Sequence, residues 1–170
     1  WYGIYLYHLS KELINLGHDV EIILVTDNKD LKEYVYEGIK VSPLYHKKSF
    51  LNKVMIINDA LFKCKFERMV QKGNYDDAII HFYEPETQNY IIDCLKENKV
   101  RVIHYLHSRN IFKRVEETRP IYRKIYLNGF YKRAYKKCDE IVCVSHCVYN
   151  DLKEKLPSIN ASIIYNGVDK

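Results

Sequence analysis

The sequence predicts an α/β domain, a Rossmann-like parallel sheet with helices on both faces. Two observations support this fold class. Short, β-branched apolar runs alternate along the 170 residues with longer segments whose apolar side chains recur at helical spacing. Glycine, proline or asparagine stands at several of the boundaries, where turns and helix ends favour them. Successive parallel strands need a crossover connection, usually a helix, so this alternation is typical of a parallel sheet.

The first third of the chain predicts one helix and two strands. Apolar residues recur at helical spacing over residues 4–16, and Gly17 follows at the position of a helix C-cap. Residues 20–25 form a short apolar run, which predicts a buried parallel strand. A weaker strand over residues 39–44 contains Pro43, which cannot donate a ladder hydrogen bond. We therefore expect this second strand to end near the edge of the sheet.

The rest of the chain continues the alternation. A long helix is predicted over residues 50–71, and Gly73 with Asn74 ends it. Pro85 stands where the first turn of the next helix would begin, a position that tolerates its missing N–H. The other predicted elements are strands at residues 78–83, 100–106, 141–144 and 162–165, a helix or helix pair from Pro120 to about Lys137, and a helix at about residues 148–156.

Composition excludes several protein classes. No window holds the ~20 apolar residues needed to span a bilayer, and nothing resembles a signal peptide. The five cysteines are odd in number and lie within apolar segments, which predicts buried, reduced thiols in a cytoplasmic protein rather than disulfides. Cys143 and Cys147 are separated by three residues, a weak signal for a metal pair. We predict no metal site.

The charge of the chain is concentrated in one segment. Residues 109–137 hold ten Lys or Arg against two acids, so the remainder of the chain is slightly acidic although the total is +5. Aromatic residues are interleaved with these cations. The segment fits the solvated face of a packed helix, an anionic membrane surface or, least favoured because no reader motif is present, a nucleic acid. The cations considered for docking are Arg119, Arg123, Lys124, Lys132 and Arg133.

Ligands of parallel sheets bind beyond the carboxyl ends of the strands, and His107 stands at such an end. An imidazole there can hydrogen-bond a substrate hydroxyl or accept its proton near neutral pH. His104 lies three residues earlier, and the period of two in a strand places it on the opposite face. The alternative for His107 is a structural histidine that bonds a backbone carbonyl.

Three further polar residues stand near predicted strand ends. His81 lies within its strand, so it fits the core or a supporting position. Glu84 precedes a helix start, where a carboxylate complements the helix dipole. Ser145 fits a helix cap whose oxygen accepts from an N–H near Val148. The sequence contains no nucleophile elbow, dinucleotide-binding glycine motif or Walker loop.

Five short motifs follow one another in order over nearly the whole chain. Together they resemble the amino-terminal domain of glycosyltransferase family 4 enzymes, one half of a GT-B fold. The motifs are Leu9-Ser-Lys-Glu-Leu13 with Gly17-His-Asp-Val20, Ile79-Ile-His81 with Glu84-Pro85, the strand from Val102 to His107, the block from Tyr131 to Ser145 with Asp139 inside it, and Asn166-Gly-Val-Asp169.

The resemblance implies a retaining transferase, of the hexosyltransferase type, that moves a sugar from a nucleotide-sugar donor to a glycan or lipid-linked acceptor without a further cofactor. Residues 1–170 would form the acceptor-side domain. The family's glycine pair and the strand before it would precede Trp1, and the donor-binding domain would follow Lys170, so residues 1–170 alone are expected to be inactive. The implied site residues are His107 as the catalytic residue, with His81, Glu84, Ser145, Asn166 and Gly167 binding substrate.

Many members of this family act on lipid-linked acceptors. The resemblance therefore favours the basic segment as a docking surface at the cytoplasmic face of the inner membrane. Two other functions fit the same residues: another GT-B enzyme, such as a sugar-nucleotide epimerase, and a non-catalytic Rossmann-like module that binds anionic polymers or membrane.

Overall fold

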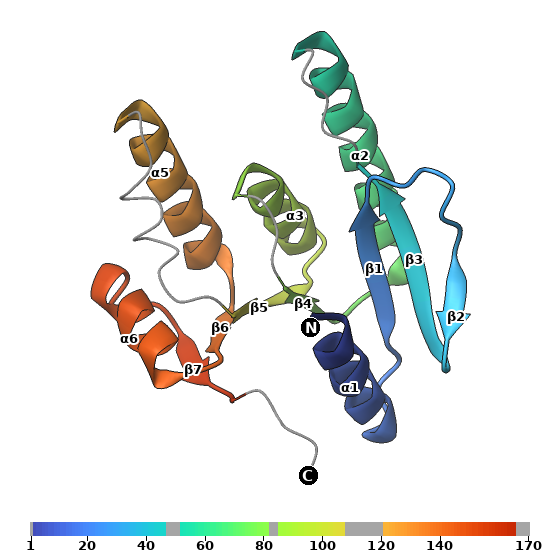
Figure 1. Cartoon of the computed structure of the whole chain (residues 1–170), viewed down its shortest axis with the longest axis horizontal. Coiled ribbons are helices and arrows are strands. Elements are labelled where there is room, and N and C mark those ends of the chain that lie inside the picture. The colour runs from blue at the N-terminus through green and yellow to red at the C-terminus, as the bar shows by residue number, and fades with distance from the viewer. Residues whose placement is uncertain (1, 47–51, 82–84, 108–120, 166–170) are drawn as a thin grey trace. The chain divides into compact units, whose positions relative to one another are not determined.

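The computed structural model describes residues 2–46, 52–81, 85–107 and 121–165 (Figure 1). The chain forms two compact units, Trp1–Met69 and Val70–Lys170. The first unit contains a three-stranded sheet and the second a four-stranded sheet. The predicted α/β class is confirmed, with the strands divided between two sheets.

The first unit begins with α1 (Tyr2–Asn15), which ends where the sequence predicts. Gly17 takes a φ of 92°, and the His18 N–H donates to the Leu13 carbonyl at 3.0 Å, as in a glycine-capped helix end. The strands of this unit are β1 (Glu21–Thr26), β2 (Tyr34–Tyr36) and β3 (Ile39–Tyr45). The helix α2 (Asn52–Gly73) begins in this unit and ends in the second.

The strand order of the three-stranded sheet is β1-β3-β2. Because β3 lies between its two neighbours, the prediction that Pro43 marks the sheet edge was wrong. Proline is tolerated there because β2 pairs with β3 only as far as Val41, so Pro43 faces a paired strand on one side only among the described residues. The strand β1 is at the edge and is half-buried, with Leu24 exposed, rather than fully buried as predicted.

The second unit contains a four-stranded sheet in which all strands are parallel, in the order β4-β5-β6-β7. Each strand therefore pairs with the next one along the chain. The alternation of these strands with helices is the one that the sequence predicts. The elements are β4 (Asp77–Ile80), α3 (Pro85–Glu97), β5 (Arg101–Leu106), α5 (Ile121–Lys137), β6 (Glu140–Cys143), α6 (His146–Lys155) and β7 (Ala161–Ile163).

The helices α3 and α5 lie side by side against this sheet (Figure 1). Ile92 of α3, Tyr135 of α5 and Ile141 of β6 are completely buried between helix and sheet layers. Each such side chain contributes about 1.5–3 kcal/mol by leaving water. The Asn89 side chain also donates to the Phe130 carbonyl at 2.9 Å, which ties the two helices together.

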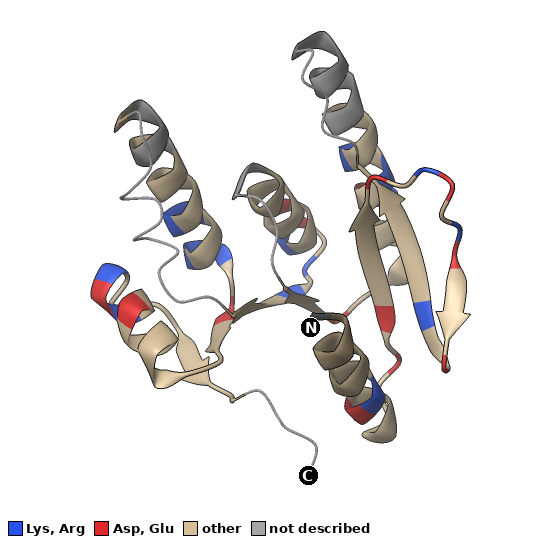
Figure 2. Ribbon diagram, viewed as in Figure 1, with Lys and Arg blue, Asp and Glu red and all other residues tan. Residues whose placement is uncertain are grey.

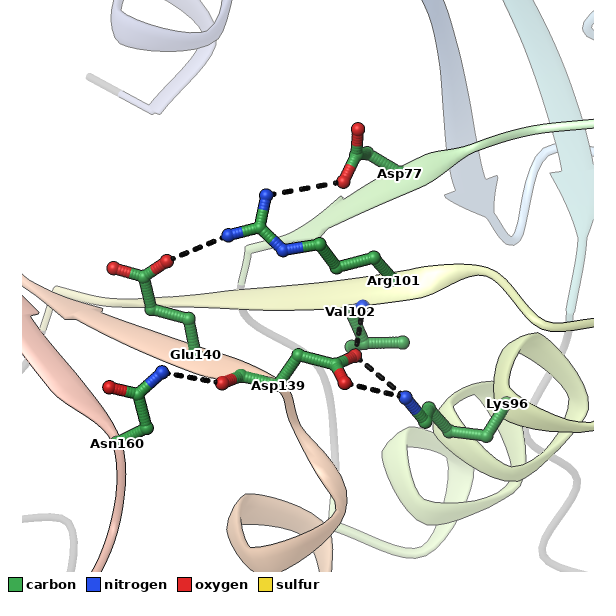
Figure 3. Close-up of polar contacts among 7 residues, drawn as sticks. All are labelled: Asp77, Lys96, Arg101, Val102, Asp139, Glu140 and Asn160. Atoms are coloured by element: carbon green, nitrogen blue, oxygen red, sulfur yellow. Dashed lines mark hydrogen bonds and ion pairs between the residues drawn. The ribbon is translucent and has the colours of Figure 1, made fainter.

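Asp139 joins four elements at the amino-terminal edge of the same sheet (Figure 3). Its carboxylate accepts from the Val102 N–H of β5 at 2.7 Å and from Lys96 Nζ of α3 at 2.7 Å. Its own N–H donates to the Val102 carbonyl at 2.9 Å, and Asn160, just before β7, donates to its carbonyl at 2.8 Å. This residue therefore fixes how the starts of β5, β6 and β7 line up.

Arg101 adds a second link along this edge. Its guanidinium lies 3.1 Å from the Glu140 carboxylate and 3.5 Å from that of Asp77, so it spans the starts of β4, β5 and β6 (Figure 3). Exposed ion pairs of this kind contribute about 0–1 kcal/mol. The partly buried, charge-assisted hydrogen bond between Asp139 and the Val102 N–H is therefore the stronger determinant of strand alignment.

All five thiols are free, as predicted, but they are not all buried. Cys94 and Cys143 are buried, whereas Cys64 and Cys147 are exposed, which corrects the expectation for these two. Burial raises the pKa of Cys138 to about 12 and that of Cys143 to about 11, so both remain protonated at neutral pH.

Candidate functional site

The carboxyl ends of the four parallel strands bring polar and aromatic residues to one edge of the second unit. His81 directly follows β4, and His107 directly follows β5. Ser145 comes just after β6, and Tyr165 just after β7. Because neighbouring strands of this sheet all run the same way, these residues line the edge where ligands of parallel sheets bind.

His81 and His107 form a hydrogen-bonded pair at this edge. The distance between His81 Nδ1 and His107 Nε2 is 2.9 Å, so one proton lies between the two rings. The pair forms because Ile80 is in register with His104, which places His81 opposite Tyr105 and on the same face as His107. We call these two residues the histidine pair.

Tyr105 supports the histidine pair from the same face of β5. Its ring stacks on His81 with centroids 5.1 Å apart and on His107 with centroids 6.0 Å apart. The tyrosine is buried, so both imidazoles rest on a fixed aromatic surface. Sequence reasoning missed Tyr105, although its spacing of two residues from His107 was a usable signal.

His104 lies on the opposite face of β5, as predicted. Its ring meets Tyr135 of α5 edge-on, with centroids 5.2 Å apart, and the side chain is buried. Burial lowers the pKa of His104 to about 4, so it is neutral at pH 7. This histidine belongs to the core beneath α5 and stands apart from the edge.

The histidine pair is also neutral at pH 7. Burial lowers the pKa of His81 to about 4, and the nearby positive charge of a protonated His107 acts in the same direction. Burial lowers the pKa of His107 below its ordinary value as well. A neutral imidazole has one donor and one acceptor nitrogen, so such a ring can bind a hydroxyl or accept its proton.

Ser145 is the N-cap of α6, as the sequence predicts. The Val148 N–H donates to its Oγ at 3.3 Å, and its backbone is extended. The next residue, His146, meets Tyr165 edge-on with ring centroids 6.0 Å apart, and both rings are exposed. This second ring pair lies at the same edge, after β6 and β7, and no pattern in the sequence indicated that the two rings would meet.

Of the other residues predicted to bind substrate or a membrane, only Lys132 and Arg133 have side chains that the structure describes. Glu84, Asn166, Gly167 and Arg119 lie outside the described residues, while Arg123 and Lys124 lie in α5 with side chains outside the description. Lys132 is half-buried and Arg133 is exposed, both on α5.

Among the described residues, no three His, Cys, Asp or Glu side chains are placed to hold a metal ion. No helix within the described ranges is long and apolar enough to cross a membrane.

Three comparisons connect this arrangement to known proteins. The model of the family described as Glycosyltransferase Family 4 matches residues 3–170. An uncharacterized glycosyltransferase from Methanocaldococcus jannaschii is 25% identical over 160 residues, which cover 94% of this chain and 42% of that protein. The structure of sucrose-phosphate synthase from Thermosynechococcus elongatus matches with a TM-score of 0.77 at 14% identity, over 99% of this chain and 43% of that one.

The structural likeness establishes that the fold is one half of a GT-B fold, with its parallel four-stranded sheet flanked by helices. At 14% identity it carries no statement about substrate. The chain spans less than half the length of each of these two relatives.

Proposed function

The chain belongs to glycosyltransferase family 4, and from this membership we propose that it forms the acceptor-side domain of a retaining hexosyltransferase. The enzyme takes its sugar from a nucleotide-sugar donor and passes it to a glycan or lipid-linked acceptor, without a further cofactor. The observation that carries the proposal is the family match over residues 3–170, nearly the whole chain. The histidine pair at the carboxyl edge supports it, because that edge is where such sheets bind ligands.

We assign His107 the central role in this proposal. In the transfer, the bond between the anomeric carbon and the donor phosphate breaks, the acceptor oxygen bonds to that carbon, and the acceptor hydroxyl loses its proton. A neutral imidazole at the sheet edge is suited to bind a hydroxyl or accept that proton. Glu84, Ser145, Asn166 and Gly167 complete the proposed substrate-binding set, and His81 lies beside His107 in the histidine pair.

The family membership favours a transferase over the two alternatives, a sugar-nucleotide epimerase and a non-catalytic binding module. A sugar-nucleotide epimerase would also cleave a nucleotide sugar, and a binding module would cleave none. We expect residues 1–170 alone to be inactive, because in the proposed enzyme a second domain holds the donor nucleotide.

We expect the full-length protein to release nucleoside diphosphate slowly from one sugar nucleotide of a panel, because water can take the place of the acceptor hydroxyl in the proposed transfer. The measurement is free UDP or GDP, with heat-inactivated protein as the control. A lipid extract is then added as a source of acceptor, and transfer of labelled sugar into it is expected. Folded protein that releases no nucleotide from any donor, with or without the extract, would contradict the proposal.

We further propose that α5 docks the enzyme on an anionic lipid surface at the cytoplasmic face of the inner membrane. The sequence of α5 contains no Asp or Glu, and its described cations are shown in blue in Figure 2. Ile121 and Ile125, one helical turn apart, are 75% and 68% exposed on the same helix. Exposed apolar side chains beside cations suit the boundary between lipid headgroups and acyl chains.

The double substitution Lys132→Glu with Arg133→Glu is expected to weaken binding to vesicles rich in anionic lipid by about tenfold or more, since each cation near such a surface contributes about 1 kcal/mol. Replacing Ile121 and Ile125 with serine should weaken binding to the same vesicles. Vesicle sedimentation at low and physiological salt measures both.

The matched control is Lys29→Glu with Lys32→Glu, which makes the same change in net charge at exposed positions of the first unit. An equal loss of binding in this control would show a non-specific charge effect and contradict docking through α5. Absence of vesicle binding by the unmodified protein would contradict it as well.

A further inference from the structure

We propose that His81 is a positioning residue for His107, which fixes both the ring plane and the tautomer of His107 through the bond between His81 Nδ1 and His107 Nε2. The inference rests on the proposed function, in which His107 faces the reacting groups. It gives His81 a role different from direct contact with substrate. His81 acts on the reaction through a second imidazole.

The surroundings of the pair fix its geometry. His81 and Tyr105 are held opposite each other by the register of β4 and β5, with Ile80 paired to His104 one residue earlier. The two imidazoles are nearly parallel, with an angle of 28° and centroids 5.2 Å apart, and both stack on the buried Tyr105. Packing thus restricts ring rotation, and the 2.9 Å bond selects one orientation among those that packing allows.

The bond also determines where the proton of His107 resides. If His81 Nδ1 donates, His107 accepts at Nε2 and carries its proton on Nδ1. If His107 donates, its proton is on Nε2 and His81 accepts. The two rings therefore hold complementary tautomers: for a given proton position on His81, only one tautomer of His107 makes the bond, and the other is higher in energy. An enzyme that needs one donor or acceptor at a defined nitrogen gains from this selection.

Two substitutions of His81 separate the bond from the ring. Phenylalanine keeps an aromatic ring on Tyr105 but has no nitrogen, whereas asparagine keeps a hydrogen-bonding amide near the position of Nδ1 but has no ring. We expect His81→Phe to lower kcat for donor hydrolysis by about tenfold or more with little change in KM, because misplaced catalytic groups lose rate rather than binding. His81→Asn should retain kcat within about threefold.

The direct readout is the tautomer of His107, measured on the full-length protein labelled with ¹⁵N-histidine by the two-bond correlations between ring protons and nitrogens. We expect a single tautomer in the unmodified protein and in His81→Asn, and a mixture of tautomers in His81→Phe. An unchanged tautomer and an unchanged kcat in His81→Phe would overturn the proposal. Equal losses of kcat and thermal stability in both variants would also overturn it, by showing a packing role.

Nucleotide release tests the proposed transferase, and the tautomer of His107 tests the role of His81, so either can fail without the other. If the unmodified protein releases no nucleotide from any donor while the spectra show one His107 tautomer that depends on His81, the transferase proposal fails and the coupling of the pair stands. If nucleotide is released but the tautomer is mixed in the unmodified protein, the transferase stands and the positioning role fails.

Discussion

Replacing His107 with alanine is expected to lower the kcat of the full-length enzyme by about a hundredfold or more, the usual contribution of a positioned acid or base. The side chain is only half-buried at the edge of the sheet, so its loss leaves no large cavity. His81 and Tyr105, both of which it contacts, remain packed on each other without it. The loss of activity should therefore be far larger than the loss of stability.

Donor hydrolysis and thermal unfolding measured on the same preparation test this expectation. The control is His18→Ala, since His18 is exposed in the turn after α1 and its helix-end bond uses the backbone rather than the side chain. Equal activity in His107→Ala and the unmodified enzyme would remove His107 from the mechanism. A fall in melting temperature that accounts for the lost activity would assign the residue to stability instead.

Replacing Asp139 with alanine is expected to lower the free energy of unfolding by about 2–3 kcal/mol, because it removes a charge-assisted hydrogen bond and leaves the Val102 N–H buried without it. Asp139→Asn should cost less, since an amide oxygen can still accept from Val102 while the attraction to Lys96 is lost. Urea unfolding of the three proteins measures the series. A control is Asp77→Asn, where the ion pair to Arg101 is exposed and long, and little change is expected.

The effect of Asp139 should depend on pH with a defined sign. Partial burial acts to raise the pKa of this carboxyl, but the hydrogen bonds from Lys96 and the Val102 N–H outweigh it, so the pKa lies below the ordinary value of 3.8. A lowered pKa stabilises the fold above the unfolded value, and the contribution disappears as the pH falls through the folded value. The stability difference from Asp139→Ala should be full at pH 7 and should shrink as the pH falls below about 4. A difference that is constant across this range would show that the carboxylate charge is not responsible.

The sequence predicted those features that depend on neighbouring positions along the chain. The end of α1 at Gly17 follows from local backbone preference, and Ser145 was identifiable as a cap from its place before a helix. Placing His104 and His107 on opposite faces required only the period of two. Such features need no knowledge of which strands pair.

Features that depend on register or strand order were not predictable in this way. The bond between His81 and His107 exists because β4 and β5 align Ile80 with His104, and the apolar pattern of either strand permits other alignments. Pro43 indicated an edge, but the order β1-β3-β2 follows from the three-residue strand β2, which is too short to show a period. The role of Asp139 likewise needs the start of β5 beside it.

The two edges of the four-stranded sheet have a consequence for how such a domain diverges in evolution. Hydrogen bonds that align the strands gather at the amino-terminal edge around Asp139, while the histidine pair and the ring pair of His146 and Tyr165 stand at the other. Substitutions that reshape the second edge leave those alignment bonds in place. On the proposed function, changes of substrate arise at the carboxyl edge and leave the alignment bonds around Asp139 intact, so they cost the fold little stability.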